Sequence, residues 1–173
     1  MHPIKVRAEA ASDFNAIDVV NLSAFGGEAE AQLVADLRKS PGFIPDLSLV
    51  AELNGRIVGH VVLSRVQLRS GGKSKEILAL GPMSVVPSQS HRGIGSELMD
   101  AAVARAKPLC YEAIVVAGHP DYYRRFGFKA AADWGVTCNL PIPDDALLAM
   151  ELVDGALSGG GEVEYPDIFR ALF

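Results

Sequence analysis

The sequence predicts a mixed α/β (α+β) fold, in which a mixed sheet carries helices on both faces. One observation is Asn54-Gly55 between two β-branched runs, which is a strong hairpin signal. Another is the continuous apolar run YEAIVVAG over residues 111–118, as expected of a buried central strand. A third is that the segments around this strand alternate in strand-like and helix-like periodicity.

The elements follow in the order strand, two helices, three strands, helix, strand, helix and two strands. IKVR (4–7) alternates like a strand, and Ser12 or Asp13 caps the first helix, with a second helix before the stop signal Pro41-Gly42. The hairpin follows, and then a strand over 76–87 that we expect Gly81-Pro82 to break. A helix ends near Lys107-Pro108, HPDYYRRFGF (119–128) is a short helix, and ALLAMELV and GEVEY are the last two strands.

The composition indicates one folded domain over residues 1–173. Apolar residues make up 49% of the chain and charged residues 21%, which argues against disorder. No apolar run reaches the ~20 residues of a membrane span, and the N-terminus lacks a signal-peptide layout. We therefore expect a cytoplasmic protein that does not act at membranes.

Charge and metal-ligand spacing exclude several kinds of partner. The net charge of −5 is unfavourable for binding nucleic acid, which requires clustered Lys and Arg. The four histidines have no metal-ligand spacing, so no metal is expected. Cys110 and Cys138 are interpreted as small buried hydrophobes, and His60, within a strand, as structural.

The stretch SVVPSQSHRGIGSELM (84–99) takes a strand through a glycine-bearing loop into a helix. The amides of a first helical turn and the helix dipole favour an anion there, and Gly93 and Gly95 permit close backbone approach. The loop alone does not distinguish an anion site from simple turn geometry. It has no Gly-Lys-Ser/Thr, and Leu98 replaces the third glycine of a dinucleotide fingerprint.

Three stretches together resemble the GNAT superfamily of N-acetyltransferases. They are LGPMSVVP followed by the Gly-Ile-Gly loop, GHPDYYRRFGF, and the tail ELVDGALSGGGEVEYPDIF, and they span nearly the whole chain. The resemblance is to a bacterial branch of predicted acetyltransferases. It implies a mostly antiparallel mixed sheet of about seven strands with about four helices. It also implies acetyl-CoA as co-substrate, a primary amine as acceptor, and a homodimer as a common state.

The resemblance also assigns site residues. The loop amides would hold the CoA pyrophosphate, the strand before the loop would bind the pantetheine arm and the thioester oxygen, and Tyr123 would protonate the leaving thiolate. The cofactor-binding residues implied are Met83, Ser84, Val85, Ser90, His91, Arg92, Gly93, Ile94, Gly95, Ser96, Gly118 and Phe126.

Two departures from the family pattern leave alternatives open. Ser90 stands where Gln or Arg usually opens the loop, and the strand 77–80 has no glutamate to serve as general base. The base candidates are Glu76, Glu28, Glu30, His119, Asp121 or a chain of waters. An acyl-CoA sensor without catalysis, or transfer of another acyl group, are the alternative functions.

Overall fold

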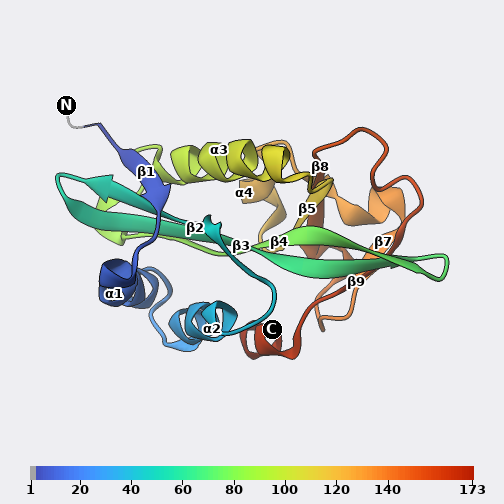
Figure 1. The fold of residues 1–173 in the computed structure, drawn as a ribbon, viewed down its shortest axis with the longest axis horizontal. Coiled ribbons are helices and arrows are strands. Elements are labelled where there is room, and N and C mark those ends of the chain that lie inside the picture. Colours follow the sequence, from blue (N-terminus) through green and yellow to red (C-terminus); the bar gives the residue numbers. More distant parts are fainter. Residues whose placement is uncertain (1–2) are drawn as a thin grey trace. The chain divides into compact units, whose positions relative to one another are not determined.

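A computed structural model describes residues 3–173 (Figure 1). Its α-helices are α1 (Phe14–Phe25), α2 (Ala29–Arg38), α3 (Ile94–Ala106) and α4 (Pro120–Arg124). Its strands are β1 (Lys5–Ala8), β2 (Phe43–Leu53), β3 (Arg56–Ser70), β4 (Lys73–Val85), β5 (Ala113–Ala117), β6 (Lys129–Ala130), β7 (Val136–Cys138), β8 (Leu147–Glu151) and β9 (Gly161–Glu164).

The chain divides into two compact units. One holds the chain up to Leu63 together with Gly81–Ala106, and the other holds Ser64–Leu80 together with Lys107–Phe173. Strands β3 and β4 each run through both units. The expectation of one GNAT domain over residues 1–173 stays a prediction.

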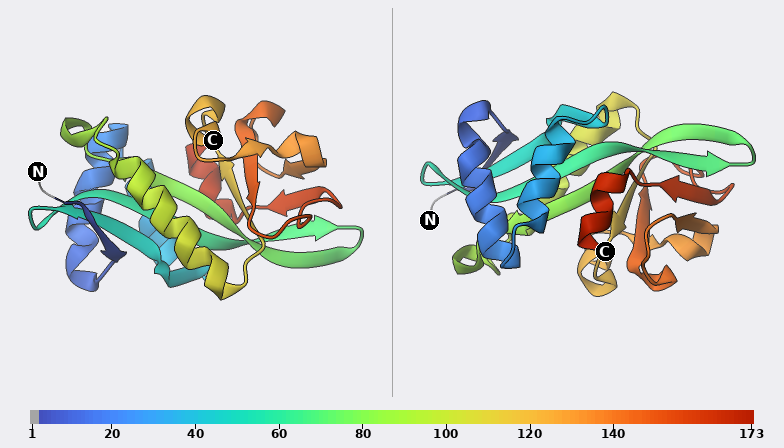
Figure 2. Two further views of the ribbon diagram at one scale, coloured as in Figure 1. Left: turned by 90° about the horizontal axis from the view of Figure 1, so that it is seen from above. Right: turned by 90° about the horizontal axis from the view of Figure 1, so that it is seen from below.

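In the first unit, α3 lies on one face of the strands, and α1 and α2 lie on the other (Figures 1 and 2). β1 pairs antiparallel with β2, with Lys5 opposite Glu52. The predicted hairpin joins β2 to β3, and Asn54 (φ 55°) and Gly55 (φ 75°) both adopt the left-handed conformation that a two-residue hairpin turn requires. Ile17, Val34 and Val50 form a buried cluster that joins α1 and α2 to β2.

The second unit is built on a parallel pair of strands. Leu78 of β4 lies opposite Ile114 of β5, so the strands preceding α3 and α4 are parallel neighbours. β8 pairs antiparallel with both β5 and β6. β9 pairs antiparallel with β3 and parallel with β7.

The mixed, mostly antiparallel sheet is confirmed, with differences in detail. The described residues form nine strands rather than about seven, because β6 and β7 are too short, at two and three residues, to show an alternating pattern. Gly81-Pro82 does not break its strand: β4 continues through this cis peptide to Val85.

The two cysteines are not buried. Cys138 is half-buried, and Cys110 is exposed with φ 67° in the turn after the 3₁₀ segment Lys107–Leu109. The interpretation of both as core residues is therefore wrong. None of the helices described for residues 3–173 is both long and apolar enough to span a bilayer.

Candidate active site

The strand-to-helix loop begins with a tight turn after β4. Pro87–Gln89 form one 3₁₀ turn, and the Ser90 amide donates to Pro87 O at 3.2 Å. The Ser90 hydroxyl donates to the same carbonyl at 2.9 Å, so this side chain stabilises the turn. Val86 N–H donates to Val58 O at 2.9 Å, which ties the start of the loop to β3.

Two residues in left-handed conformations lead the loop into α3. They are His91 (φ 65°) and Gly93 (φ 79°), and no atom lies within 4 Å of the β-carbon position of Gly93. The first bond of the helix joins Glu97 N–H to Gly93 O at 3.0 Å. The amides of the residues between them lie in the first turn, where no preceding carbonyl is available as an intrahelical partner.

Exposure separates the predicted loop residues into two groups. Ile94 is 1% exposed and anchors the start of the helix in the core, which fixes the direction of the neighbouring amides. Gly95 and Ser96 are half-buried, whereas Ser90, His91, Arg92 and Gly93 are exposed. The sequence places a left-handed glycine here because a β-carbon at φ 79° is strained for any L residue.

The predicted thioester strand forms the last three residues of β4. Ser84 is 3% exposed, and its hydroxyl is buried without a hydrogen-bond partner. Met83 and Val85, on either side of it, are half-buried. Side chains alternate along a strand, so Ser84 faces the side opposite to Met83 and Val85.

In the second unit, Tyr123 lies in α4 and is packed by aromatic rings. Its ring makes edge contacts with Tyr122 at 5.1 Å and Phe128 at 5.9 Å between centroids. Burial raises the pKa of its hydroxyl to about 12. The group therefore stays protonated at neutral pH and can donate a hydrogen bond.

The two other predicted residues of this unit pack around the tyrosines. A β-carbon on Gly118 would lie 2.7 Å from Cε2 of Tyr123, so the absence of a side chain gives the ring its space. Phe126 contacts the ring of Tyr122 at 5.2 Å between centroids. Burial raises the pKa of the Tyr122 hydroxyl, although Arg125 opposes the shift.

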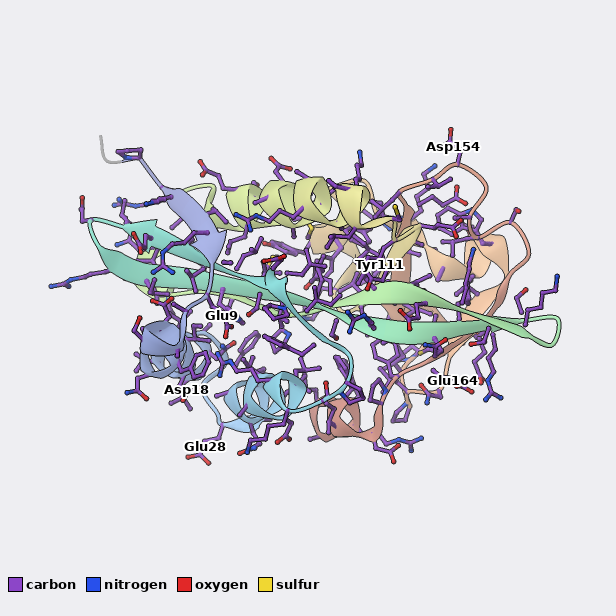
Figure 3. All side chains as sticks on the ribbon, viewed as in Figure 1. Glu9, Asp18, Glu28, Tyr111, Asp154 and Glu164 are labelled. Carbon is purple, nitrogen blue, oxygen red and sulfur yellow. The ribbon has the colours of Figure 1, made fainter. Side chains whose placement is uncertain are left out.

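The structure does not single out a base among the predicted candidates. Glu76 is half exposed and pairs with Arg65 at 3.8 Å. Glu28, His119 and Asp121 are exposed, and Glu28 points outward in Figure 3. Among residues 3–173, no group of three or more His, Cys, Asp or Glu side chains is arranged to hold a metal ion.

One polar cluster was missed by the sequence reasoning. His60 is 0% exposed, and its Nε2 lies 2.9 Å from Ser48 Oγ and 3.5 Å from Glu9 Oε1. Arg38 of α2 donates to Glu9 Oε2 at 2.8 Å, and Ser48 Oγ also donates to Glu9. These residues are far apart in the sequence, and only the fold brings them together.

Burial and charge act in opposite directions within this cluster. Burial alone would raise the pKa of the Glu9 carboxyl, but hydrogen bonds from His60, Arg38 and Ser48 lower it to about 2. Burial lowers the pKa of His60, and Glu9 only partly offsets this. At neutral pH the cluster therefore contains a carboxylate and a neutral imidazole.

Comparison with known proteins places these features in a family context. A family model described as the acetyltransferase (GNAT) domain matches residues 45–130. The uncharacterized N-acetyltransferase YhbS of Escherichia coli strain K12 is 33% identical over 167 residues, covering 95% of this chain and 98% of the relative.

Two solved structures match over almost the whole length of this chain. The crystal structure of YhbS from Escherichia coli in complex with CoA has a TM-score of 0.91 and 31% identity, covering 98% of this chain and 93% of that one. A GNAT family acetyltransferase from Brucella melitensis in complex with acetyl-CoA has a TM-score of 0.78 and 30% identity, covering 98% and 99%.

Proposed function

The chain belongs to the GNAT family of N-acetyltransferases, and from this premise we propose that it transfers the acetyl group of acetyl-CoA directly to a primary amine. Acetyl-CoA-dependent acyl transfer is the activity of the family, and the similar structures contain CoA and acetyl-CoA. The acceptor is the amine of a small molecule, a peptide or a protein.

The main support for the cofactor site is the start of α3. A pyrophosphate would accept hydrogen bonds from the amides of Gly93, Ile94 and Gly95, where the helix dipole adds positive potential. Open space beside Gly93 and the buried anchor Ile94 both fit this role. Exposed His91 and Arg92 would add donors at the rim, with Ser96 beside them in the first turn.

The departure at Ser90 does not weaken this proposal. Its hydroxyl is bonded to Pro87 O, so its contribution is to hold the turn from which the amides follow. A loop that binds through main-chain donors depends on backbone geometry more than on the identity of this side chain.

The thioester would be held by the end of β4. Main-chain groups of Met83, Ser84 and Val85 would bind the pantetheine arm, and the Val85 amide would donate to the carbonyl oxygen. A neutral amine then attacks the carbonyl carbon, and the negative charge that develops on the oxygen is stabilised by that donor. The C–S bond breaks as the intermediate collapses to the amide and a thiolate.

Tyr123 is proposed to donate its phenolic proton, or a hydrogen bond, to the departing thiolate. A thiol has an ordinary pKa of roughly 8.5, so the thiolate is a modest base and a hydrogen bond suffices. Gly118 gives the ring its space, and Phe126 supports it through Tyr122. The other proton, from the attacking nitrogen, must leave to a base.

Turnover with amines tests the proposal. The purified protein is incubated with acetyl-CoA and a panel of polyamines, amino acids, aminoglycosides and N-terminal peptides, and release of free thiol is followed. Amine-dependent release is expected. Tight acetyl-CoA binding without release would instead identify an acyl-CoA sensor, and release only with longer acyl-CoA donors would identify another acyl transferase.

The remaining expectations on partners are also proposals. We propose cytoplasmic action on acetyl-CoA and an amine, without nucleic acid, in keeping with the net charge of −5. A homodimer is tested by light scattering after size-exclusion chromatography, where a mass of 18.4 kDa would show a monomer.

A further inference from the structure

We propose that His60 is the terminal proton acceptor of the acetyl-transfer reaction. Ser48 and Glu9 fix the imidazole proton on Nε2 and leave the lone pair of Nδ1 free, and Nδ1 takes the proton lost by the attacking amine through one bridging water. The inference rests on the proposed acetyl transfer and names the base that this transfer requires.

The hydrogen bonds of the cluster determine the tautomer of His60. A hydroxyl has one proton, and Ser48 directs it to the Glu9 carboxylate, which can only accept. Ser48 Oγ must therefore accept from His60, so the imidazole proton is on Nε2. Nδ1 is left as an unprotonated acceptor.

This Nδ1 atom has no partner among the described residues. It is a buried acceptor on a side chain that is 0% exposed. Buried polar atoms without a protein partner usually bind an ordered water or a ligand group. The cluster thus holds a basic atom ready to receive a proton.

The position of His60 relates it to the proposed thioester strand. Val86 N–H donates to Val58 O, and the β-carbon position of Gly59 lies 3.2 Å from Ser84 O, so this part of β3 borders the end of β4. When the antiparallel pairing is continued from the Val58–Val86 bond without a bulge, His60 lies opposite Ser84, and the two side chains point to the same face of the sheet.

Like His60 Nδ1, the hydroxyl oxygen of Ser84 is a buried polar atom without a hydrogen-bond partner. Two unpartnered polar atoms therefore come from adjacent strands. One water between Ser84 Oγ and His60 Nδ1 would satisfy both atoms. Such a water would lie beside the main chain proposed to hold the thioester.

The contacts of the neighbouring Gly59 show on which face of the sheet the His60 side chain lies. The β-carbon position of Gly59 lies 3.0 Å from Leu98 and 3.1 Å from Ile94 in α3, so His60 points away from α3. It points to the side of α1 and α2, where Glu9 lies (Figure 3). The charged groups that act on His60 are Glu9 and Arg38.

The proton balance of the step is simple. As the amine nitrogen bonds to the carbonyl carbon, its N–H proton passes to the water, and a water proton passes to Nδ1. The resulting imidazolium is stabilised by Glu9, whose carboxylate lies 3.5 Å from Nε2 and is held by Arg38. The thiolate takes its proton from Tyr123, Tyr123 regains a proton from solvent, and His60 returns its proton to solvent between turnovers, so that no net proton is gained or lost.

Two variants separate this role from a structural one. His60→Gln keeps a donor toward Ser48 and removes the basic atom, and Glu9→Gln removes the charge that stabilises the imidazolium. Asp13→Asn is the matched control, because Asp13 is also a buried carboxylate held by an arginine, Arg7, but has no contact with His60.

The measurements are kcat and KM for the best amine of the panel across pH, acetyl-CoA affinity, and thermal stability. We expect His60→Gln to lower kcat about 100-fold, as is typical for loss of a general base, and to remove the contribution of His60 from the acid limb of the kcat/KM profile, leaving only that of the amine. Glu9→Gln should shift that limb to lower pH, because the Glu9 carboxylate raises the pKa of His60 and its loss makes the imidazole harder to protonate. Asp13→Asn should leave the limb in place, and a shift to higher pH in Glu9→Gln, or no shift at all, would contradict the coupling.

The outcomes distinguish the inference from its premise. Unchanged kcat and an unchanged acid limb in His60→Gln overturn the role of His60 but leave acetyl transfer intact, whereas wild-type protein without turnover overturns the transfer itself. Should His60→Gln not fold, imidazole ¹⁵N NMR of the wild-type protein decides. A proton on Nε2 is expected at neutral pH, and a proton on Nδ1 would refute the proposal.

Discussion

Gly118→Ala tests whether the position of the Tyr123 ring controls the reaction. The added β-carbon would lie 2.7 Å from Cε2 of Tyr123, whereas ordinary contacts begin at 3.4 Å. The difference, 3.4 − 2.7, means that the ring edge must move by at least about 0.7 Å. Phe128 and Tyr122 pack against the ring, so the movement also displaces the hydroxyl.

The expected effect is on turnover more than on binding. Misplacement of a reacting group by about 1 Å can cost about 100-fold in rate, so we expect kcat to fall about 10- to 100-fold. Overpacking typically costs about 1–3 kcal/mol of stability, which lowers the melting temperature by several degrees. KM for acetyl-CoA should change little.

Steady-state thiol release and differential scanning fluorimetry measure both effects. Gly27→Ala is the control, because no atom lies within 4 Å of its β-carbon position and its backbone is not left-handed. A Gly118→Ala protein with wild-type kcat and melting temperature would refute the reasoning, because the ring would then have moved without consequence.

Three further predictions concern the loop, the tyrosine and the buried carboxylate. Gly93→Glu should weaken acetyl-CoA binding at least tenfold by calorimetry, whereas Gly72→Glu, at nearly the same φ of 78° in a turn with open space, should bind normally. Tyr123→Phe should bind acetyl-CoA normally and lose about tenfold or more in kcat, and full turnover would contradict its role. Glu9 has its pKa lowered from 4.5 to about 2, so its stabilisation is complete above pH 4.5 and is lost as the pH falls toward 2. The difference in the free energy of unfolding between wild type and Glu9→Gln should therefore be on the order of 3 kcal/mol above pH 4.5 and shrink as the pH falls toward 2. A difference that urea unfolding finds constant over this range would contradict the prediction.

The fold was predictable where local signals were strong. Asn54-Gly55 determined the hairpin because a two-residue turn requires two left-handed residues, and YEAIVVAG predicted a buried strand from its apolar run. Strands β6 and β7 were not predictable, because strands this short depend on partners distant in the chain. The predicted break at Gly81-Pro82 was wrong for a related reason: pairing on both sides of the dipeptide carries β4 through it.

The candidate site also contains parts that local sequence predicts and parts that only the fold assembles. The Gly-Ile-Gly loop and the tyrosine pair are each a short continuous stretch of sequence, so their local structure could be predicted, and their roles stay predictions. The cluster of Glu9, Ser48 and His60 is assembled from three segments, and no spacing links them. A histidine inside an apolar strand was interpreted as structural, and only its hydrogen bonds indicate which ring nitrogen carries the proton.

Cys110 bears directly on how this enzyme is assayed. Its exposed thiol would react with any reagent that detects released CoA, adding a signal of one equivalent per chain before turnover begins. Its φ of 67° is also a conformation that glycine adopts without strain. Cys110→Gly should therefore remove the background reaction and stabilise the turn at the same time, which makes it a suitable parent for every variant above.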